Sequence, residues 1–213
     1  MMTIKAVIFD LDGVIVSTDE FHYEAWKKIS DEEGIPFNHT INNRLRGVSR
    51  MESLNIILER AEREYSPEEK QELAERKNEY YKKSLVNLTP DDLLPGAKDT
   101  IDELKRRKVK IAIGSSSKNT PTILKQIGLA DAFDAIADGN DITHSKPDPE
   151  VFLLAASRLD IKPEECLVVE DAEAGVQAAI AGGMNVAAVG DAGLHSQDAD
   201  YRLERVDEIL DLI

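Results

Sequence analysis

The chain has 213 residues, of which 42% are hydrophobic and 31% are charged. This composition is typical of a folded globular protein and excludes a chain that is disordered throughout. Acidic residues outnumber basic ones by 41 to 26, which gives a formal net charge of −15. So negative a surface repels nucleic acids and anionic membranes, and we expect neither as a partner. A phosphate-bearing ligand would need a locally positive site, made by a metal ion or by clustered lysines and arginines.

Cys166 is the only cysteine, so the chain cannot form an intrachain disulfide. It lies in an apolar run, where a buried and inert thiol is expected. The N-terminal residues lead directly into a predicted strand, without the longer apolar stretch of a secretory signal. No apolar run reaches the roughly 18 residues that a membrane helix requires. We therefore expect a cytoplasmic protein, and a monomer, because no exposed apolar helix face stands out.

Taken in chain order, the first predicted element is an apolar strand at Ile4–Phe9. The stretch from Thr18 to Val86 contains no convincing strand and predicts three or four helices. Ser49 and Ser66 are each followed three residues later by a glutamate, which is the pattern of a helix capping box. The first strand is thus followed by a helical insert.

After Pro90, short apolar runs alternate with amphipathic segments. A helix is predicted after Asn119-Thr120-Pro121, where the asparagine would cap the first turn and the proline would lie within it. Further strands are predicted at Val109–Gly114, Ala135–Ala137, Cys166–Val169 and Asn185–Val189.

This alternation predicts an α/β fold, with a Rossmann-like parallel sheet flanked by helices. We expect the sheet to form a core domain from residues 1–16 and 91–213. The helical insert would form a separate cap domain from residues 17–90.

Polar side chains follow four of the predicted strands. Asp10-Leu11-Asp12-Gly13 comes directly after the first strand, and residues 115–119 follow the second. Lys146 lies in the loop beyond the third strand, and Glu170-Asp171 follows the fourth. Because ligands of open parallel sheets bind beyond the carboxyl ends of the strands, we expect these groups to meet in one site.

The grouped side chains suit phosphoryl transfer. Neighbouring carboxylates in a partly buried pocket repel one another unless a cation lies among them, and oxygen ligands of this kind suit Mg²⁺. A carboxylate can act as the nucleophile and form an aspartyl-phosphate, while a second carboxyl serves as general acid and base. Lys146 and the serines that follow the second strand would hold the oxygens of the transferring group.

Each motif taken alone has a simpler explanation. Asp-x-Asp-Gly also occurs in turns and calcium loops, although here Val14, Val16 and Thr18 replace the later calcium ligands. A serine cluster can be an ordinary polar loop, a lone lysine can be solvated, and Glu170-Asp171 can cap a helix. Their order at successive strand ends favours the functional interpretation.

In this order the four motifs resemble those of the haloacid dehalogenase superfamily. The resemblance implies that Asp10 is the nucleophile and Asp12 the general acid/base. It implies that Ser115 and Lys146 bind the transferring phosphate and that the cofactor is Mg²⁺. The implied metal ligands are Asp10, Asp12 through its backbone carbonyl, Glu170 and Asp171.

Within that superfamily, four segments resemble the β-phosphoglucomutases: residues 20–26, 45–50, 76–78 and 117–119. The resemblance implies a second phosphate site, where Arg50 of the cap and residues 117–119 of the core grip the phosphate that is not being transferred. His22 and Lys77 would contact the sugar or position Asp12. The implied substrate-binding residues are Thr18, His22, Trp26, Gly47, Val48, Ser49, Arg50, Lys77, Ser115, Ser116, Ser117, Lys118, Asn119 and Lys146.

Several of these residues are ordinary when taken singly. Arg50 could be a solvated arginine of a capping box, and Trp26 could be a core residue of an amphipathic helix. Lys77 lies in a charge-rich helix, and His22 alone favours neither interpretation. Their joint occurrence supports a binding role.

The resemblance implies interconversion of β-D-glucose 1-phosphate and glucose 6-phosphate through phospho-Asp10. The expected partners are a sugar phosphate and glucose 1,6-bisphosphate. One alternative is a magnesium-dependent sugar-phosphate phosphatase, in which water accepts the phosphoryl group. Another is a non-catalytic sugar-phosphate sensor, although a sensor would not need both Asp10 and Asp12.

Overall fold

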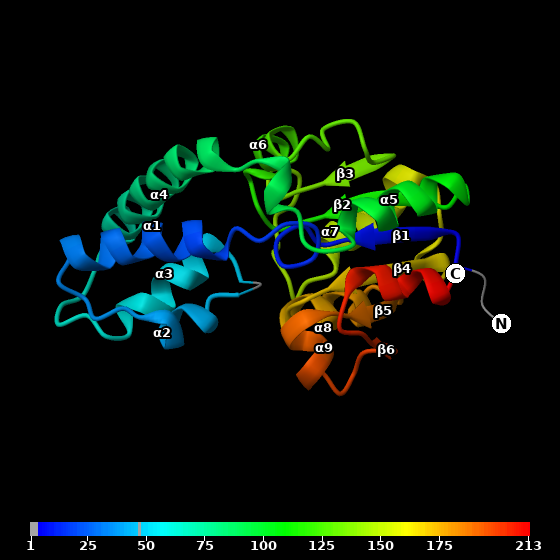
Figure 1. Ribbon diagram of the computed structural model, residues 1–213. Helices are drawn as coiled ribbons and strands as arrows, with labels where there is room; N and C mark the ends of the chain where they lie inside the picture. Colours follow the sequence, from blue (N-terminus) through cyan, green and yellow to red (C-terminus); the bar gives the residue numbers. More distant parts are fainter. Residues whose placement is uncertain (1–3, 47) are drawn as a thin grey trace.

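A computed structural model of the chain describes residues 4–46 and 48–213. Its centre is a six-stranded sheet with the order β3-β2-β1-β4-β5-β6, in which every neighbouring pair is parallel (Figure 1). The strands are β1 Ala6–Phe9, β2 Lys110–Gly114, β3 Ala135–Ala137, β4 Cys166–Glu170, β5 Asn185–Ala188 and β6 Tyr201–Arg202. The predicted α/β fold with a parallel sheet is confirmed.

Helices cover both faces of the sheet, which explains why the central strands are almost continuously apolar. One face packs against α5, α6 and η4, and the other packs against α7, α8 and α9. Buried residues alternate between the two faces along β1, where Val7 and Phe9 face one layer and Ala6 and Ile8 the other. The helices of these layers are α5 Ala97–Arg106, α6 Thr120–Gln126, α7 Glu150–Leu159, α8 Glu173–Ala181, α9 Gly190–His195 and the 3₁₀ helices η3 Pro163–Glu165 and η4 Val206–Asp211.

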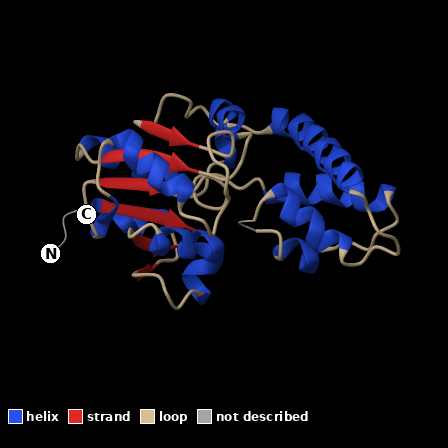
Figure 2. Ribbon diagram, turned by 180° about the vertical axis from the view of Figure 1, so that it is seen from behind, coloured by secondary structure: helices blue, strands red, loops and turns tan. Residues whose placement is uncertain are grey.

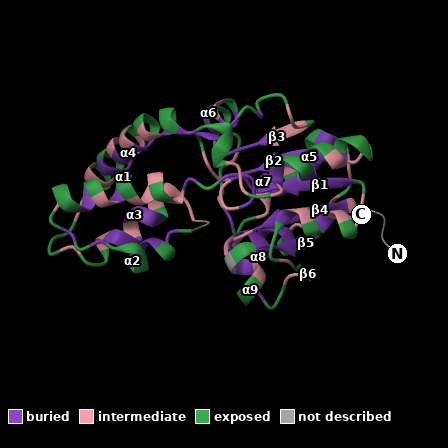
Figure 3. Cartoon of the chain, viewed as in Figure 1, coloured by how far each residue is buried: buried purple, intermediate pink, exposed green. Residues whose placement is uncertain are grey.

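The segment after β1 forms a separate layer of helices, toward which the carboxyl ends of the strands point (Figure 2). Its helices enclose an apolar core of their own, which includes Trp26, Ile29, Leu54 and Leu73 (Figure 3). The cap helices are α1 Asp19–Glu32, α2 His39–Asn43, α3 Arg50–Leu58 and α4 Pro67–Ser84, followed by the 3₁₀ helices η1 Leu85–Asn87 and η2 Pro90–Asp92. Across the part of the chain that the structure describes, no helix has the length and apolar character needed to span a membrane.

The two segments that join the cap to the core lie against each other. Val16, on the outgoing segment, forms an antiparallel bridge with Leu93 on the returning one. Leu94 N–H donates to the carbonyl of Ile15 at 2.9 Å. The cap therefore leaves and re-enters the core at one point, close to the carboxyl end of β1.

Local sequence signals explain where α3 and α4 begin. Ser66 Oγ accepts from the backbone N–H of Glu69, and the Glu69 carboxylate accepts from the backbone N–H of Ser66, so the predicted capping box of α4 is complete. At α3, Ser49 Oγ accepts from Glu52 N–H. The first strand begins at Ala6 rather than at Ile4. Strand β6 was not predicted, because two exposed residues produce no apolar run.

Gly114 lies where β2 meets α7, and we predict that Gly114→Ala destabilises the fold. A Cβ at this position would lie 2.6 Å from Cδ1 of Phe152, so the helix would have to move away from the sheet. Overpacking of this kind costs about 1–3 kcal/mol in the free energy of unfolding, measurable by urea denaturation. Gly182→Ala is the matched control, because its nearest neighbours lie at 3.4 Å. Equal losses in both variants would contradict the prediction.

Candidate active site

A cleft of about 1460 Å³ lies between the carboxyl ends of the strands and the cap. It brings together most of the residues that the sequence predicts for the site. Thr18 is an exception, since it is buried beneath the cleft, and Gly47 lies outside the described residues. The predicted residues that line the cleft are Asp10, Asp12, His22, Trp26, Val48, Ser49, Arg50, Lys77, Ser115, Ser116, Ser117, Lys118, Asn119, Lys146, Glu170 and Asp171.

The buried ammonium of Lys146 joins two carboxylates at the base of the cleft. Lys146 Nζ lies 2.6 Å from Asp10 Oδ1 and also donates to the carboxylate of Glu170. Burial alone would lower the pKa of Lys146, but the charges of Asp10 and Glu170 outweigh it and raise the pKa above its usual range. Lys146 is therefore a fixed positive charge beside the carboxylate of Asp10.

Three carboxylates crowd together next to this lysine. Oxygens of Asp10, Glu170 and Asp171 lie within 4.8 Å of one another. Burial raises the pKa of Glu170 to about 7, with the charge of Asp10 adding to the effect. Burial and the neighbouring carboxylates also raise the pKa of Asp171 well above its usual range. A divalent cation that prefers oxygen ligands would relieve this repulsion, so the donor set fits a metal ion.

Glycine is required at position 13, where the chain turns sharply beside Asp171. Gly13 has a φ of +83°, which L side chains rarely adopt. A Cβ there would lie 2.0 Å from Oδ2 of Asp171. The Asp-x-Asp-Gly turn therefore lets the backbone pass directly against a candidate metal ligand.

The carboxyl of Asp12 is held by Thr18, at the start of the cap. Thr18 donates to Asp12 from its backbone N–H at 2.7 Å and from its hydroxyl at 2.5 Å. The hydroxyl of Tyr81 in turn donates to Thr18 Oγ1 at 3.0 Å. Burial raises the pKa of Asp12 to about 6, although the two bonds from Thr18 oppose the rise. A carboxyl with this pKa can both hold and release a proton near neutral pH.

A buried lysine and a half-buried histidine lie on the cap side of Asp12. Lys77 is 2% exposed, and its Nζ lies 2.6 Å from Nδ1 of His22. Burial, and then the charge of Arg50, lower the pKa of Lys77 well below its usual range. Burial, and then the charge of Lys77, lower the pKa of His22, so its neutral ring can accept from the ammonium. His22 Nε2 lies 3.7 Å from Oδ2 of Asp12.

Trp26 supports this pair from within the cap. It is 2% exposed and belongs to the apolar core of the cap helices. The ammonium of Lys77 lies 4.9 Å from the centroid of its ring, within the range of a cation–π contact. The structure therefore places Trp26 mainly as packing behind Lys77.

A second polar group lines the cleft, made by Arg50 from the cap and the loop after β2. In that loop Ser117 Oγ accepts from Asn119 N–H at 3.1 Å. The hydroxyl of Ser116 is buried and has no hydrogen-bond partner among the residues that the structure describes. Burial lowers the pKa of Arg50. This group offers a guanidinium, the ammonium of Lys118 and hydroxyls to an anion.

The predicted cap of α6 by Asn119 is wrong, since the side chain makes no capping bond. Its amide Nδ2 instead donates to Oδ1 of Asn78 at 3.0 Å, across the cleft from core to cap. The side chain of Asn119, which local sequence rules assign to the start of α6, is therefore used for a long-range bond.

Sequence reasoning missed several residues of the cleft. Tyr81 lies one helical turn after Lys77 on α4, and its ring stacks on His22 with centroids 4.0 Å apart. Residues four positions apart lie on the same face of a helix, so the spacing from Lys77 to Tyr81 was a signal that could have identified Tyr81. Arg46 pairs with Asp19 beside the site, and nothing in the local sequence pattern predicts that pair.

We predict that Lys77→Met stabilises the fold. Within the described residues, Lys77 forms no salt bridge with a carboxylate, and replacing such a buried ammonium by an apolar side chain adds about 1–2 kcal/mol to the free energy of unfolding. Its pKa is lower in the folded than in the unfolded chain, so between those two values the unfolded state binds more protons. Stability of the unmodified chain should therefore rise as the pH rises toward about 10.

Urea unfolding of the unmodified protein and of Lys77→Met at about pH 7 and 9 checks this prediction. The gain from Lys77→Met should shrink at the higher pH. Lys83→Met, an exposed lysine on the same helix, is the matched control and should change stability little. A loss of stability in Lys77→Met would contradict the prediction.

Known proteins resemble this chain over most of its length. It is 48% identical to a β-phosphoglucomutase of Bacillus subtilis over 188 residues, which cover 87% of this chain and 83% of the relative. It is 31% identical to a phosphorylated carbohydrates phosphatase of Thermotoga maritima, covering 84% and 82% of the two chains. The crystal structure of a β-phosphoglucomutase from Clostridium difficile superposes with a TM-score of 0.90 at 38% identity, covering 97% of this chain and 93% of that one.

The family match agrees with the geometry of the cleft. The haloacid dehalogenase-like hydrolase family matches residues 4–183, a range that includes every strand-end motif described above. Together with the parallel sheet and the relatives, this match shows that the chain belongs to the haloacid dehalogenase-like hydrolase family.

Proposed function

We propose that the chain is an isomerase that interconverts β-D-glucose 1-phosphate and glucose 6-phosphate through β-glucose 1,6-bisphosphate. The observation that carries this proposal is the presence of two cationic groups in one cleft. Lys146 lies beside Asp10, while Arg50 and Lys118 belong to the second group. A mutase must hold a bisphosphate at both ends, so it needs two anion sites, whereas transfer to water needs one.

Asp10 carries the phosphoryl group between the two sugar positions. A carboxylate oxygen of Asp10 attacks the phosphorus at C1 of the bisphosphate, the bond from that phosphorus to the sugar oxygen breaks, and glucose 6-phosphate is released. Asp12 gives its proton to the departing sugar oxygen. In the other half-reaction the Asp12 carboxylate takes the proton of the C6 hydroxyl of β-glucose 1-phosphate, whose oxygen attacks the phosphorus of phospho-Asp10, forms the bisphosphate and releases the carboxylate of Asp10.

The residues around Asp10 prepare it for this exchange. Lys146 and Ser115 would hold oxygens of the transferring group, and Lys146 also keeps Asp10 in place. Mg²⁺ would be held by Asp10, the Asp12 backbone carbonyl, Glu170 and Asp171, in agreement with the crowded oxygens found there. When bound, the ion neutralises charge on the transferring phosphoryl oxygens.

The cap would recognise the sugar and the distal phosphate. The guanidinium of Arg50 can fork onto phosphate oxygens better than an ammonium can, which suits it to the fixed end of the substrate. His22 and Lys77 would face the sugar and orient Asp12, to which Thr18 is already bonded. Residues 47–49 and Ser116–Asn119 would complete the contacts. Water is excluded when the substrate fills the cleft, which protects the aspartyl-phosphate.

Sugar-phosphate hydrolysis is the second candidate function. Two relatives are named phosphatases: the Thermotoga maritima protein and the fructose-1-phosphate phosphatase YqaB of Escherichia coli, which is 32% identical and covers 84% of this chain. Both reactions use a phospho-aspartate, so the core chemistry does not separate them. The two reactions differ in the acceptor of the phosphoryl group, which is water in a hydrolase and a sugar hydroxyl in a mutase.

The role of Arg50 tests the two-site proposal. Arg50→Ala should lower mutase turnover by about 10- to 100-fold, since it removes a charge-assisted hydrogen bond worth about 1.5–3 kcal/mol. Hydrolysis of acetyl phosphate, which has no second phosphate, should stay within about twofold of the unmodified enzyme. A coupled assay for glucose 6-phosphate and an assay for inorganic phosphate measure the two activities.

Two further variants sharpen this test. Arg50→Lys should retain an intermediate mutase activity, because a point charge remains without the planar fork. Arg60→Ala removes an exposed arginine of the cap outside the cleft and should leave both activities unchanged. Equal loss of mutase and acetyl phosphatase activity in Arg50→Ala would reject the second phosphate site.

A further inference from the structure

Lys146 differs from the other charged groups around Asp10, because it lies in a long loop and not at a strand end. The loop leaves β3 after Ala137 and reaches α7 at Glu150. The Lys146 side chain must nevertheless be placed accurately enough to contact both Asp10 and Glu170. Some interaction must therefore fix the backbone of the loop near Lys146.

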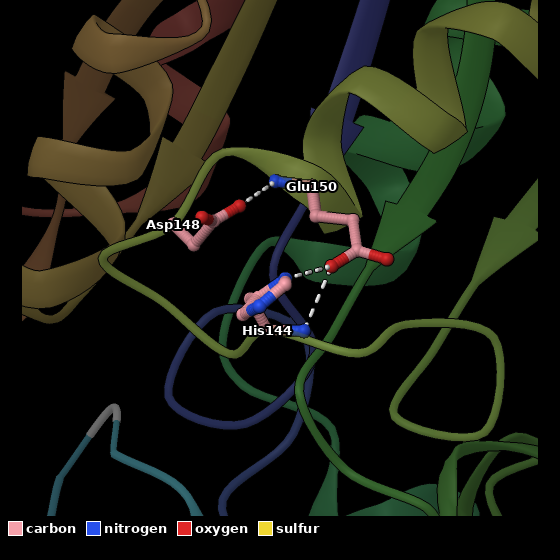
Figure 4. A group of neighbouring side chains, drawn as sticks. All are labelled: His144, Asp148 and Glu150. Carbon is pink, nitrogen blue, oxygen red and sulfur yellow. Dashed lines mark hydrogen bonds and ion pairs between the residues drawn. The ribbon is translucent and has the colours of Figure 1, made fainter.

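Glu150, the first residue of α7, provides such an interaction (Figure 4). Its carboxylate accepts from the backbone N–H of Thr143 at 3.0 Å and from that of His144 at 2.7 Å. Asp148 Oδ1 accepts from the backbone N–H of Glu150 at 3.0 Å. The carboxylate thus ties the chain just before Lys146 to the helix just after it, and closes the loop around the lysine.

These contacts explain a cluster that also resembles a metal site. His144, Asp148 and Glu150 have ligand atoms within 4.8 Å of one another. Both oxygens of Glu150 already accept backbone N–H bonds, and those bonds lower the pKa of Glu150 and keep it ionised. His144 Nδ1 lies 3.2 Å from the same carboxylate. The cluster is therefore accounted for by interactions within the chain.

Helix α7 is itself anchored to the sheet that carries the nucleophile. Phe152, two residues after Glu150, is fully buried against Gly114 of β2 and Ile8 of β1. Its ring also faces Lys146, whose Nζ lies 4.6 Å from the ring centroid. A continuous set of contacts thus runs from β1 through α7 and Glu150 to the loop of Lys146, and back to Asp10.

We propose that Glu150 is a positioning residue for phosphoryl transfer, which acts by holding the loop that places Lys146 against Asp10. The proposal rests on the role proposed for Lys146 in binding the transferring phosphate. Glu150 is not among the described residues that line the cleft. It accepts two backbone hydrogen bonds, so a variant that cannot accept them leaves the lysine less well placed.

A double-mutant cycle with Lys146 tests this proposal. Glu150→Ala should lower kcat by about tenfold, since a misplacement of about 1 Å costs up to a hundredfold. In a Lys146→Ala background the same change should lower kcat by less than about twofold, because the group that it positions is gone. Glu150→Gln keeps one acceptor oxygen and should show an intermediate kcat. If Glu150→Ala does not fold, Glu150→Gln replaces it in the double-mutant cycle with Lys146→Ala.

Arg158→Ala is the matched control for loss of loop stability alone. Arg158 ties the beginning of the same loop to the end of α7 through two bonds to Asp141, at 2.8 and 2.9 Å. Its removal should lower the melting temperature while kcat changes by less than about twofold. An equal loss of kcat from Glu150→Ala with and without Lys146 would overturn the positioning role. Full activity of Lys146→Ala would instead reject the proposed role of Lys146, and the inference with it.

Discussion

The structure of the cleft depends on the ammonium of Lys146 between Asp10 and Glu170. Parallel strands bring their polar ends to one edge of the sheet, which crowds carboxylates in a place where burial makes their charges unfavourable. The lysine offsets part of that repulsion and keeps Asp10 oriented. The same crowding leaves Asp171 beside Gly13 with a raised pKa, in a position that suits a metal ligand. Charge balance, and not packing alone, accounts for this arrangement.

The proposed role of the cap is different, namely to recognise a polar ligand from a helical surface. Its surface includes a buried lysine that contacts His22 and the ring of Trp26 and forms no salt bridge with a carboxylate of the described residues. An arrangement of this kind lowers stability in the free protein and is favourable when a sugar phosphate supplies the missing partners. In the function proposed above, the cap would contribute selectivity and the core would contribute the phosphoryl-transfer chemistry.

Much of the fold could be predicted from the sequence, because apolar runs and caps are local signals. The strands after Pro90 and the helical insert follow from such patterns, whereas β6 does not, since Tyr201 and Arg202 are exposed. The strand-end residues of the site were predictable for the same reason. The hydrogen bond between Asn78 and Asn119 was not, because it joins residues 41 positions apart across the cleft. The support of Asp12 by Thr18 and Tyr81 likewise depends on tertiary contacts.

The central claim is that the phosphoryl group moves along the sugar through Asp10. A ³¹P NMR time course of the enzyme with Mg²⁺, β-glucose 1-phosphate and a trace of glucose 1,6-bisphosphate tests it most directly, with Asp10→Asn as the inactive control. We expect the starting signal to be replaced by glucose 6-phosphate with little inorganic phosphate, and no change with the control. Growth of inorganic phosphate in place of glucose 6-phosphate, or turnover by Asp10→Asn, would contradict the claim.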